Sequence, residues 1–192
     1  MDPVNIIVLL NIIATFGANV SGAQHGLKSK VMVAKEKPKT YLQKLPLVLS
    51  ALTIITLVIA TFQIGTLEYI ENLNPVRYSG LLIYLVFSWF QIWAFRTLGE
   101  NYSQDIMIKK DHQLVTKGPF KIIRHPQYLS QILLDLGASA ATLSYLVFAL
   151  TIIEIPFIIM RAIVEEKMME KYFGNSFSEY KKKSGFIIPF IG

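Results

Sequence analysis

The sequence predicts an all-α integral membrane protein with about five transmembrane helices. Hydrophobic residues make up 53% of the 192 residues and charged residues only 17%, and the hydrophobic residues fall in long blocks. A bilayer core of roughly 30 Å needs about 20 apolar helical residues to cross it, so these blocks are expected to be membrane spans rather than core helices. At this length the chain is expected to form one domain.

Each predicted span follows from an apolar block. The first block starts with Met1-Asp2-Pro3 and lacks the basic start of a signal peptide, so it is predicted to remain as the first helix. The small residues at 21–23 leave a cleaved signal as the alternative. The predicted spans are residues 4–20, 45–64, 78–98, 126–142 and 145–161, followed by a cytoplasmic C-terminal segment, residues 162–192.

The last apolar block, residues 126–160, is too long for one span and short for two, and the charges decide between them. Of the 19 Lys and Arg residues, 18 lie in three segments, 28–44, 96–124 and 161–183, with six in each. The positive-inside rule places all three segments in the cytoplasm, which requires an outside N-terminus and a last block that crosses twice. With a turn near residues 137–144, each leg has about 16 residues, or roughly 24 Å of helix.

Composition also excludes several function classes. The net charge of +6 is explained by membrane orientation and anionic lipid headgroups, so no nucleic-acid partner is predicted. The chain has no cysteine, hence no disulfide, thiol nucleophile or thiolate metal site, and no metal centre is predicted. It also lacks the Gly-rich strand-to-helix fingerprint of soluble nucleotide-binding folds.

Most of the polar residues lie in two segments that the charges place in the cytoplasm. In the first, residues 103–109 and 113–120 are short, β-capable pieces, with turns at Lys110-Asp111 and Gly118-Pro119. In the second, the last membrane helix is predicted to run on to Phe173-Gly174. A short helix then follows, capped by Asn175 or Ser176.

Arg124, His125 and Pro126 stand where the chain enters the last apolar block. Proline is well tolerated in the first turn of a helix, so Pro126 is predicted to begin the fourth helix. The free amides and positive dipole end of a helix start form an anion site, to which Arg124 and His125 would add charge. On residue types alone, an interfacial anchor remains the simpler interpretation.

Two carboxylates, Glu165 and Glu166, stand where the last helix leaves the membrane. Arg161 lies four residues before Glu165, so the two side chains share a helix face. An interfacial salt bridge of little energetic value is one interpretation of this pair. A functional role for the adjacent carboxylates is the other.

Three segments together resemble the isoprenylcysteine carboxyl methyltransferase family, within the wider group of membrane phospholipid methyltransferases. The order of their motifs is specific: RHPxY opens a membrane helix, an Arg-x3-Glu-Glu follows about 35 residues later, and then FG…EY. The resemblance covers roughly the C-terminal half, and the five-span layout fits small prokaryotic members. The segments are LGENYSQ (98–104), HQLVTKGPFKIIRHPQY (112–128) and RAIVEEKMMEKYFGNSFSEY (161–180).

This resemblance implies an S-adenosylmethionine pocket at the cytoplasmic face, formed by the 99–125 loop and the C-terminal helices. It implies that Arg161, Glu165 and Glu166 are the catalytic residues, with Glu165 pairing with the cofactor and Arg161 facing the substrate. Phe120 replaces a frequent Tyr, and Lys167 replaces a third acidic residue. The cofactor residues implied are His112, Gln113, Leu114, Val115 and Phe120 at the adenosyl end, and His125, Pro126, Gln127, Tyr128 and Glu165 at the methionine end.

The chemistry of methyl transfer agrees with these residue types. Displacement at a sulfonium needs little acid–base help, so catalysis should come from positioning and from excluding water. The cofactor's carboxylate suits the helix start at Pro126, and its ammonium suits Glu165. An anionic acceptor would need a cation, and Arg161 is placed to hold it.

Asp135 and Glu154 are the acidic residues inside the last apolar block. A carboxyl group within a membrane segment is a functional candidate by default. The alternative is a protonated or hydrogen-bonded group packed against polar neighbours such as Gln131. If functional, the two residues would shape the site for the acceptor headgroup.

The sequence therefore predicts an S-adenosylmethionine-dependent membrane methyltransferase with its active site facing the cytoplasm. The expected partners are membrane lipid and a lipophilic or prenylated acceptor, most simply a prenylcysteine-type carboxylate. A phospholipid amine N-methyltransferase and an NADPH enzyme similar to membrane sterol reductases are the enzyme alternatives. A small transporter or assembly factor is the non-enzyme alternative, although transporters usually show repeats and this chain shows none.

Overall fold

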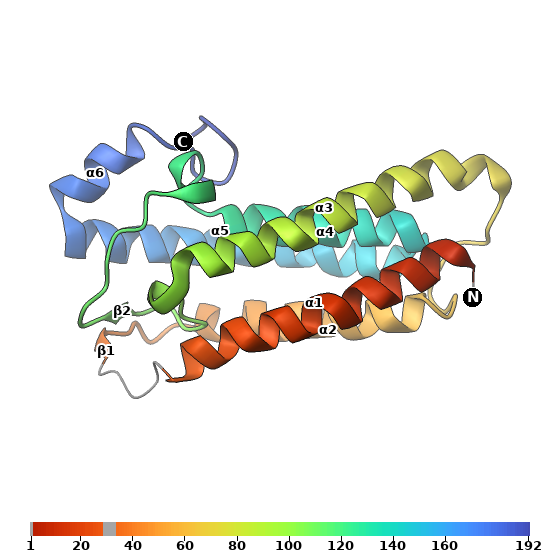
Figure 1. The fold of residues 1–192 in the computed structure, drawn as a ribbon, viewed down its shortest axis with the longest axis horizontal. Coiled ribbons are helices and arrows are strands. Elements are labelled where there is room, and N and C mark those ends of the chain that lie inside the picture. The colour runs from red at the N-terminus through yellow and green to blue at the C-terminus, as the bar shows by residue number, and fades with distance from the viewer. Residues whose placement is uncertain (1, 29–33) are drawn as a thin grey trace.

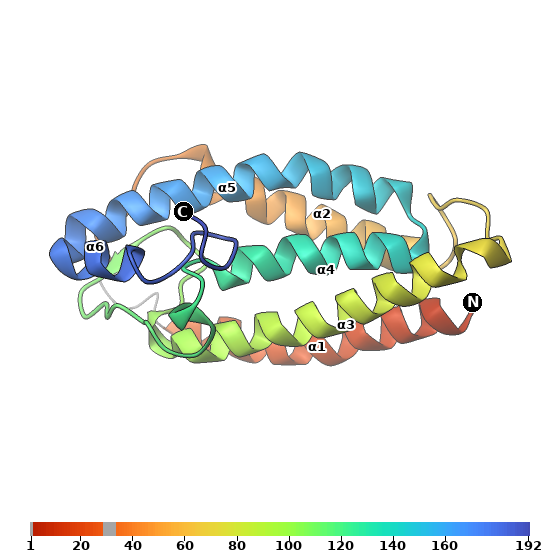
Figure 2. The same ribbon diagram turned by 90° about the horizontal axis from the view of Figure 1, so that it is seen from above.

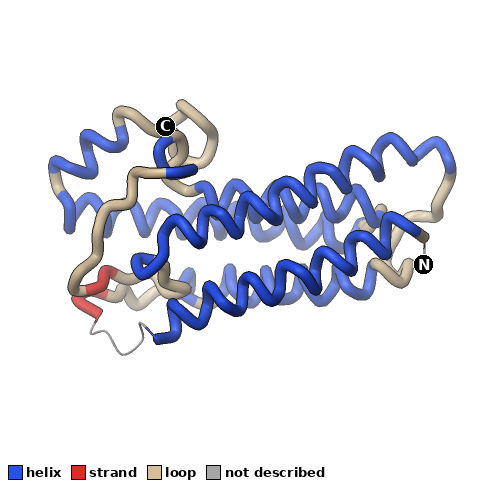
Figure 3. The backbone as a smooth tube through the Cα atoms, in the orientation of Figure 1, coloured by secondary structure: helices blue, strands red, loops and turns tan. Residues whose placement is uncertain are grey.

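The protein is an elongated bundle of long helices in the computed structural model, which describes residues 2–28 and 34–192. Figure 1 shows the N-terminus at one end of the bundle, and the short strands, the last helix and the C-terminus at the other. Figure 3 shows that helices make up most of the chain. The helices are α1 (Pro3–Lys28), α2 (Leu45–Ala60), α3 (Asn74–Leu98), α4 (Pro126–Thr142), α5 (Tyr145–Phe173) and α6 (Asn175–Lys181).

The predicted all-α membrane fold is confirmed, and five long helices occur where spans were predicted. Within the described residues, three helical segments are long and apolar enough to cross a membrane: Tyr41–Ala60, Glu71–Asn101 and Tyr145–Phe173. A shorter apolar helix covers Pro3–Gly17. Helix α4 has only 17 residues, and several of them are polar, which lowers its mean hydropathy. The number of crossings therefore stays a prediction.

Helices α3 and α4 approach each other closely through glycine. A Cβ atom on Gly80 would lie 2.8 Å from the Gly137 carbonyl oxygen, and one on Gly137 would lie 2.6 Å from the Tyr84 nitrogen. Small residues allow this kind of backbone contact between membrane helices. Gly137 therefore lies inside α4, and the chain reverses later, at Leu143 with φ 55° and at Ser144, whose hydroxyl caps α5.

The apolar core lies towards the N-terminal end of the bundle. Figure 2 shows α2 and α5 on one side of α4, with α3 and α1 on the other. A smaller cluster at the opposite end packs the loop after α3 against α5 through Ile106, Ile108 and Met168. The main cluster consists of Val4, Val8, Leu57, Ala60, Tyr84, Ala138, Ala141 and Val147.

Two local predictions need correction. Of the two β-capable pieces, only residues 103–109 contain a strand, β2 (Ile108–Lys109). It pairs antiparallel with β1 (Ala34–Glu36), and residues 113–120 form no strand. Residues 118–121 form a 3₁₀ turn instead. Helix α6 is preceded by Gly174 with φ 53° and has no side-chain cap, so neither Asn175 nor Ser176 caps it.

Candidate active site

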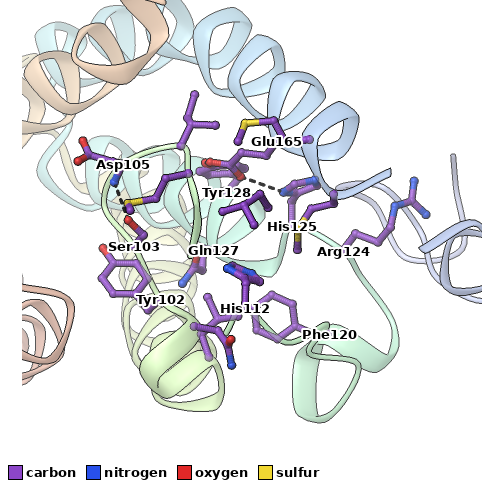
Figure 4. A pocket seen from close by; sticks show the side chains of 17 residues that line it. Tyr102, Ser103, Asp105, His112, Phe120, Arg124, His125, Gln127, Tyr128 and Glu165 are labelled. Carbon is purple, nitrogen blue, oxygen red and sulfur yellow. Dashed lines mark hydrogen bonds and ion pairs between the residues drawn. The ribbon is translucent and has the colours of Figure 1, made fainter. Parts of the chain in front are cut away.

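A pocket lies at the end of the bundle that carries α6, between the loop after α3, the start of α4 and the last turns of α5 (Figure 4). We call it the site pocket. It encloses about 730 Å³ when the space of its open mouth is included. Its lining residues are Leu98, Asn101, Tyr102, Ser103, Asp105, Ile106, Met107, Ile108, His112, Phe120, Arg124, His125, Gln127, Tyr128, Glu165, Met168 and Met169.

The start of α4 is fixed by the C-terminal segment. Pro126 is the first residue of α4, as predicted, and His125 is its N-cap. The Arg124 amide donates to the Gly185 carbonyl at 2.9 Å, and the His125 amide donates to the Phe186 carbonyl at 3.1 Å. Only glycine fits at 185, since a Cβ atom there would lie 2.0 Å from the Ile188 carbonyl oxygen. Pro126 itself lines none of the cavities described here and acts by starting the helix.

His125 lies between the two carboxylates of α5. Its Nδ1 is 3.8 Å from Glu165 Oε2, and its Nε2 is 3.5 Å from Glu166 Oε1. The imidazole stacks on the Tyr128 ring at 5.4 Å and meets the edge of Phe186 at 5.2 Å. Figure 4 shows the His125 and Glu165 side chains pointing towards each other at one side of the pocket. The ring is therefore held in one orientation beside the pocket.

Arg161, Glu165 and Tyr128 form one hydrogen-bonded group. The Tyr128 hydroxyl donates to Glu165 Oε1 at 2.6 Å, and Arg161 Nε donates to the same hydroxyl at 2.9 Å and to Glu165 Oε1 at 3.2 Å. Arg161 is 4% exposed, and its two Nη atoms donate to the carbonyls of Leu42 at 3.3 Å and Gln104 at 2.6 Å. A guanidinium has five N–H donors, so two remain for a ligand.

The two predicted carboxylates face different surroundings. Glu165 lines the site pocket, whereas Glu166 accepts a hydrogen bond from Arg124 Nε and lies 3.6 Å from Lys181 Nζ. Arg124 also donates to the carbonyls of Ser184 and Gly192. Successive residues on an α-helix point about 100° apart, which separates the pair. Glu166 therefore ties the start of α4 to the C-terminal segment.

A second cavity continues the site pocket beneath the 112–120 loop, and we call it the loop cavity. It shares His112, Phe120, Arg124 and His125 with the site pocket. The other implied adenosyl-end residues, Gln113, Leu114 and Val115, line the loop cavity alone. The structure therefore gathers all five of those residues around two adjoining cavities.

The polar groups of this region include buried atoms without partners. Within the described residues, His112 Nδ1, His125 Nε2 and Gln127 Nε2 are buried and make no hydrogen bond. Burial, with a smaller effect of the Lys109 charge, lowers the pKa of His112 to about 4, so its imidazole is neutral near pH 7. Neutral His112 and the Gln127 amide can serve the polar edge of a heterocycle, because buried polar groups are normally hydrogen-bonded.

A third cavity lies between α2, α3, α4 and α5, and we call it the bundle cavity. It shares Tyr102, Ser103, Gln127 and Tyr128 with the site pocket. Arg161 lines it, together with both Glu154 and Ser50. Glu154 thus lies at a cavity wall, whereas Asp135 reaches the cavity only through its hydrogen bond with Gln131.

The 99–125 loop was predicted to form the pocket, but no single residue directly after α3 was named; residues 101–103 and 105–108 form one wall of the site pocket. Buried Lys109 holds this wall, because its Nζ donates to the carbonyls of Glu100 and Tyr102. Burial lowers the pKa of Lys109. The motif LGENYSQ was the signal for this wall. Met168 and Met169, one turn beyond Glu165, also line the pocket without any distinguishing pattern.

The chain resembles known proteins over much of its length. A family model described as phospholipid methyltransferase matches residues 76–176, more than half of the chain. Protein-S-isoprenylcysteine O-methyltransferase of Schizosaccharomyces pombe is 30% identical over 146 residues, which are 66% of this chain and 61% of that protein. The protein of the same name from Saccharomyces cerevisiae is 33% identical over 115 residues, which are 58% of this chain and 48% of that protein. This chain thus spans only part of the length of these relatives.

The fold is also shared with a solved structure, that of the eukaryotic intramembrane Ras methyltransferase ICMT (isoprenylcysteine carboxyl methyltransferase). The TM-score is 0.62 at 21% sequence identity, over 100% of this chain and 69% of that one. The matched family region, residues 76–176, includes all but the first two residues of α3, the whole of α4 and both carboxylates of α5. The chain belongs to the phospholipid methyltransferase family, and over about two thirds of its length it resembles a protein-S-isoprenylcysteine O-methyltransferase.

Proposed function

We propose that this protein is an S-adenosylmethionine-dependent integral membrane methyltransferase that esterifies the carboxylate of a lipophilic or lipid-attached acceptor, of the prenylcysteine type. One observation supports this most strongly: Glu165, Tyr128 and Arg161 form a hydrogen-bonded group where the site pocket adjoins the bundle cavity. A cofactor on one side and an acceptor on the other would then meet beside a single set of charges.

The residues around the site pocket fit S-adenosylmethionine. His112 Nδ1 and Gln127 Nε2, buried without partners among the described residues, suit the polar atoms of an adenosyl group. Phe120 and Ile106 supply apolar surface for it. The Glu165 carboxylate suits an ammonium group through a charge-assisted hydrogen bond. When bound, the cofactor supplies a methyl group made electrophilic by its sulfonium.

The protein's own contribution to the reaction is positioning. Tyr128 and Arg161 hold Glu165 in one orientation through hydrogen bonds; Arg161 is buried, and Tyr128 and Glu165 are half-buried. The two spare N–H groups of Arg161 would hold the acceptor carboxylate and orient one of its oxygens towards the site pocket for methylation. An ionised carboxylate needs no general base.

The proposed orientation of the site in the membrane follows from the distribution of Lys and Arg along the chain. The site pocket lies among the basic segments that the positive-inside rule places in the cytoplasm. The acceptor would approach from the bilayer, and its modified end would reach the cytoplasmic face. Membrane lipid and a prenylated or otherwise lipophilic molecule are the partners of this proposal.

The deciding experiment compares two cofactors and follows one reaction. Purified protein in detergent should bind radiolabelled S-adenosylmethionine and not NADPH. It should also transfer label to a prenylcysteine analogue, giving a product that base hydrolysis cleaves, as expected of a methyl ester. NADPH binding alone would instead favour a reductase. Base-stable label in a phospholipid amine would show that the acceptor is an amine, with S-adenosylmethionine still the cofactor.

A further inference from the structure

Apolar side chains are exposed in the loop that follows α6, outside the long helices. Phe190 is 81% exposed, and Ile188 and Ile191 are each more than half exposed. The Phe186 amide donates to the Ile191 carbonyl at 2.7 Å and closes this loop, so we call residues 186–191 the apolar loop. Exposed apolar side chains that gather in one place mark an interaction surface. Because the loop is not part of a predicted span, its exposure needs an explanation of its own.

The tip of the apolar loop is a turn that favours glycine but contains phenylalanine. The Ile191 amide donates to the Ile188 carbonyl at 3.2 Å, which closes a β-turn with Pro189 and Phe190 in its middle. Proline suits the first of these two positions, but Phe190 has φ 63°, where a turn residue is usually glycine. A non-glycine residue in this region strains the backbone, and such strain is typical of functional sites. Contact of the exposed ring with a partner would offset the strain.

The apolar loop is fixed beside the start of α4. The amides of Arg124 and His125 donate to the carbonyls of Gly185 and Phe186, where the loop begins. Pro126, the next residue, is the first of α4. Figure 1 and Figure 2 both show the end of the chain beside the first turns of α4, and Figure 1 shows it on the side away from α1 and α2. The loop is thus held on the outside of the bundle.

This position is level with the end of a candidate membrane span. The 3₁₀ turn before α4 packs on the end of α3, since a Cβ atom on Gly118 would lie 3.1 Å from the Thr97 side chain. The Ile122 carbonyl, directly after this turn, accepts a hydrogen bond from the Gly185 amide at 2.9 Å, and the Ile122 side chain is also exposed. Helix α3 belongs to the candidate span Glu71–Asn101. An apolar loop outside the bundle at this level meets the bilayer surface.

Exposed lysines flank the apolar loop in sequence and at the start of α4. They are Lys117 and Lys121 around the turn before α4, and Lys182 and Lys183 after α6. Basic side chains next to exposed apolar ones are typical of membrane-surface segments, because apolar groups enter the headgroup–acyl boundary while cations bind anionic headgroups. A second copy of the chain would bring the same charges to this surface, and like charges facing each other are unfavourable. A bilayer with anionic lipid therefore fits the surface better than a second copy.

We propose that the apolar loop docks into the bilayer leaflet on the side of the candidate site, with the Phe190 ring at the boundary between headgroups and acyl chains. The lysines beside the loop then face anionic headgroups. Docking fixes the depth of the start of α4, and with it the site pocket, relative to the membrane surface. The inference requires only an integral membrane protein, so it goes beyond the proposed function and does not depend on the cofactor or the acceptor.

A single nitroxide label tests this docking in the full chain. The chain has no cysteine, so Ile191→Cys carries one label next to Phe190, and Glu179→Cys carries one on the exposed side of α6 as the matched control. The protein is placed in nanodiscs of phosphatidylcholine and phosphatidylglycerol. Oxygen concentrates in the bilayer and a nickel chelate stays in water, so their collision rates with the label report its surroundings. The ratio of oxygen to nickel collisions should be several-fold higher at 191 than at 179.

Phe190→Gly in the labelled Ile191→Cys protein separates docking from the shape of the turn. Glycine suits the positive φ, so the turn is kept while the phenyl ring is lost. The ratio at 191 should then fall towards that of the Glu179→Cys control. Phe190→Trp is the conservative variant and should keep the high ratio, because tryptophan also favours the membrane interface.

The other outcomes contradict the proposal in different ways. An equal ratio at 191 and 179 would place the apolar loop in water and overturn the docking. Protection of the label at 191 from both oxygen and nickel would show that protein, such as a second copy of the chain, covers the loop instead of lipid. A ratio unchanged by Phe190→Gly would show that the helices alone set the depth of the loop, and would overturn docking through Phe190.

Discussion

The two ends of the bundle each contain a buried arginine, and they use it differently. At the N-terminal end, Arg77 donates to Asp2 Oδ1 at 2.7 Å, to Asn5 Oδ1 at 3.2 Å and to the Ala141 carbonyl at 3.0 Å, and it lies over the Tyr69 ring. At the other end, Arg161 lines the bundle cavity and donates hydrogen bonds to Tyr128 and Glu165, which line the site pocket. Among the described residues, all four buried side-chain atoms without a hydrogen-bond partner belong to residues that line these cavities. None of them belongs to the Arg77 cluster.

This contrast suggests different roles: the Arg77 cluster stabilises the fold, and the Arg161 cluster serves the candidate site. The Arg77 cluster joins the first turn of α1, the start of α3 and the end of α4, and none of the cavities described above reaches it. It also explains the one cation outside the three basic segments, because Asp2 balances the charge of Arg77. The Arg161 cluster keeps unused donors and acceptors, as a ligand site requires.

The largest expected difference between the ends is their side of the membrane. The chain has no cysteine, so single cysteines at two exposed positions, Glu71 near the Arg77 end and Lys182 near the site, report orientation directly. In intact cells an impermeant thiol reagent should label Glu71→Cys fully and Lys182→Cys not at all. The reverse pattern, or labelling of both, would contradict the predicted topology with an outside N-terminus.

Removing Arg77 should destabilise the fold without affecting the site. Arg77→Ala leaves Asp2 and Asn5 without their donor, and because the Asp2 side chain is 26% exposed we expect a loss of about 1–3 kcal/mol of unfolding free energy, as for a hydrogen-bonded group left without its partner. Denaturation in detergent measures this loss. The affinity of the remaining folded protein for S-adenosylmethionine should match the wild type. A specific loss of affinity would mean that the two ends are coupled.

These two clusters also show what the sequence alone can and cannot predict. Pro126 predicts the start of α4 because proline fits the first turn, and long apolar runs predict the helices. The RHPQY and HQLV motifs indicated residues that the structure gathers around the site pocket and the loop cavity. Arg77 and Asp2 are 75 residues apart, and no local pattern connects them.

The sequence could not predict the finer arrangement of the site either. Glu165 and Glu166 are adjacent in sequence, and only the orientation of α5 decides that one faces the site pocket and the other Arg124. The wall formed by residues 101–103 and 105–108 depends on Lys109, whose two carbonyl partners lie seven and nine residues away in an irregular loop. Such contacts follow from tertiary packing, not from periodicity.

At the site end, Arg161→Lys should reduce methyl transfer by about 10- to 100-fold, the loss expected for charge-assisted hydrogen bonds. An ammonium cannot reproduce the planar fork that reaches Tyr128, the loop carbonyl of Gln104 and an acceptor carboxylate together. S-adenosylmethionine affinity, measured on the same preparation, should change little. Parallel losses of affinity and rate would show that Arg161 only steadies Glu165 and the loop.

Glu165 and His125 are expected to act on the cofactor instead. Glu165→Gln or His125→Ala should weaken S-adenosylmethionine binding by about 1–3 kcal/mol in calorimetry, the usual loss for a charge-assisted hydrogen bond. Glu170→Gln is the control on the same helix, because Glu170 is exposed and lines none of the cavities described above. Unchanged affinity in both site variants would remove these residues from the cofactor site.

The smallest effect concerns pH and His112. Because burial lowers its pKa from 6.5 to about 4 in the folded protein, the unfolded chain binds more protons than the folded one between these values. Stability should therefore fall as pH decreases through 6.5 towards 4, and His112 should have little effect well above 6.5. Since the residue is partly exposed, we expect only about 0.5 kcal/mol of loss between pH 7 and pH 6. Chemical denaturation of the wild type and of His112→Asn at both pH values isolates this contribution. The variant should lose less stability than the wild type over the interval, and equal losses would mean that the His112 imidazole is as readily protonated in the folded protein as in the unfolded chain.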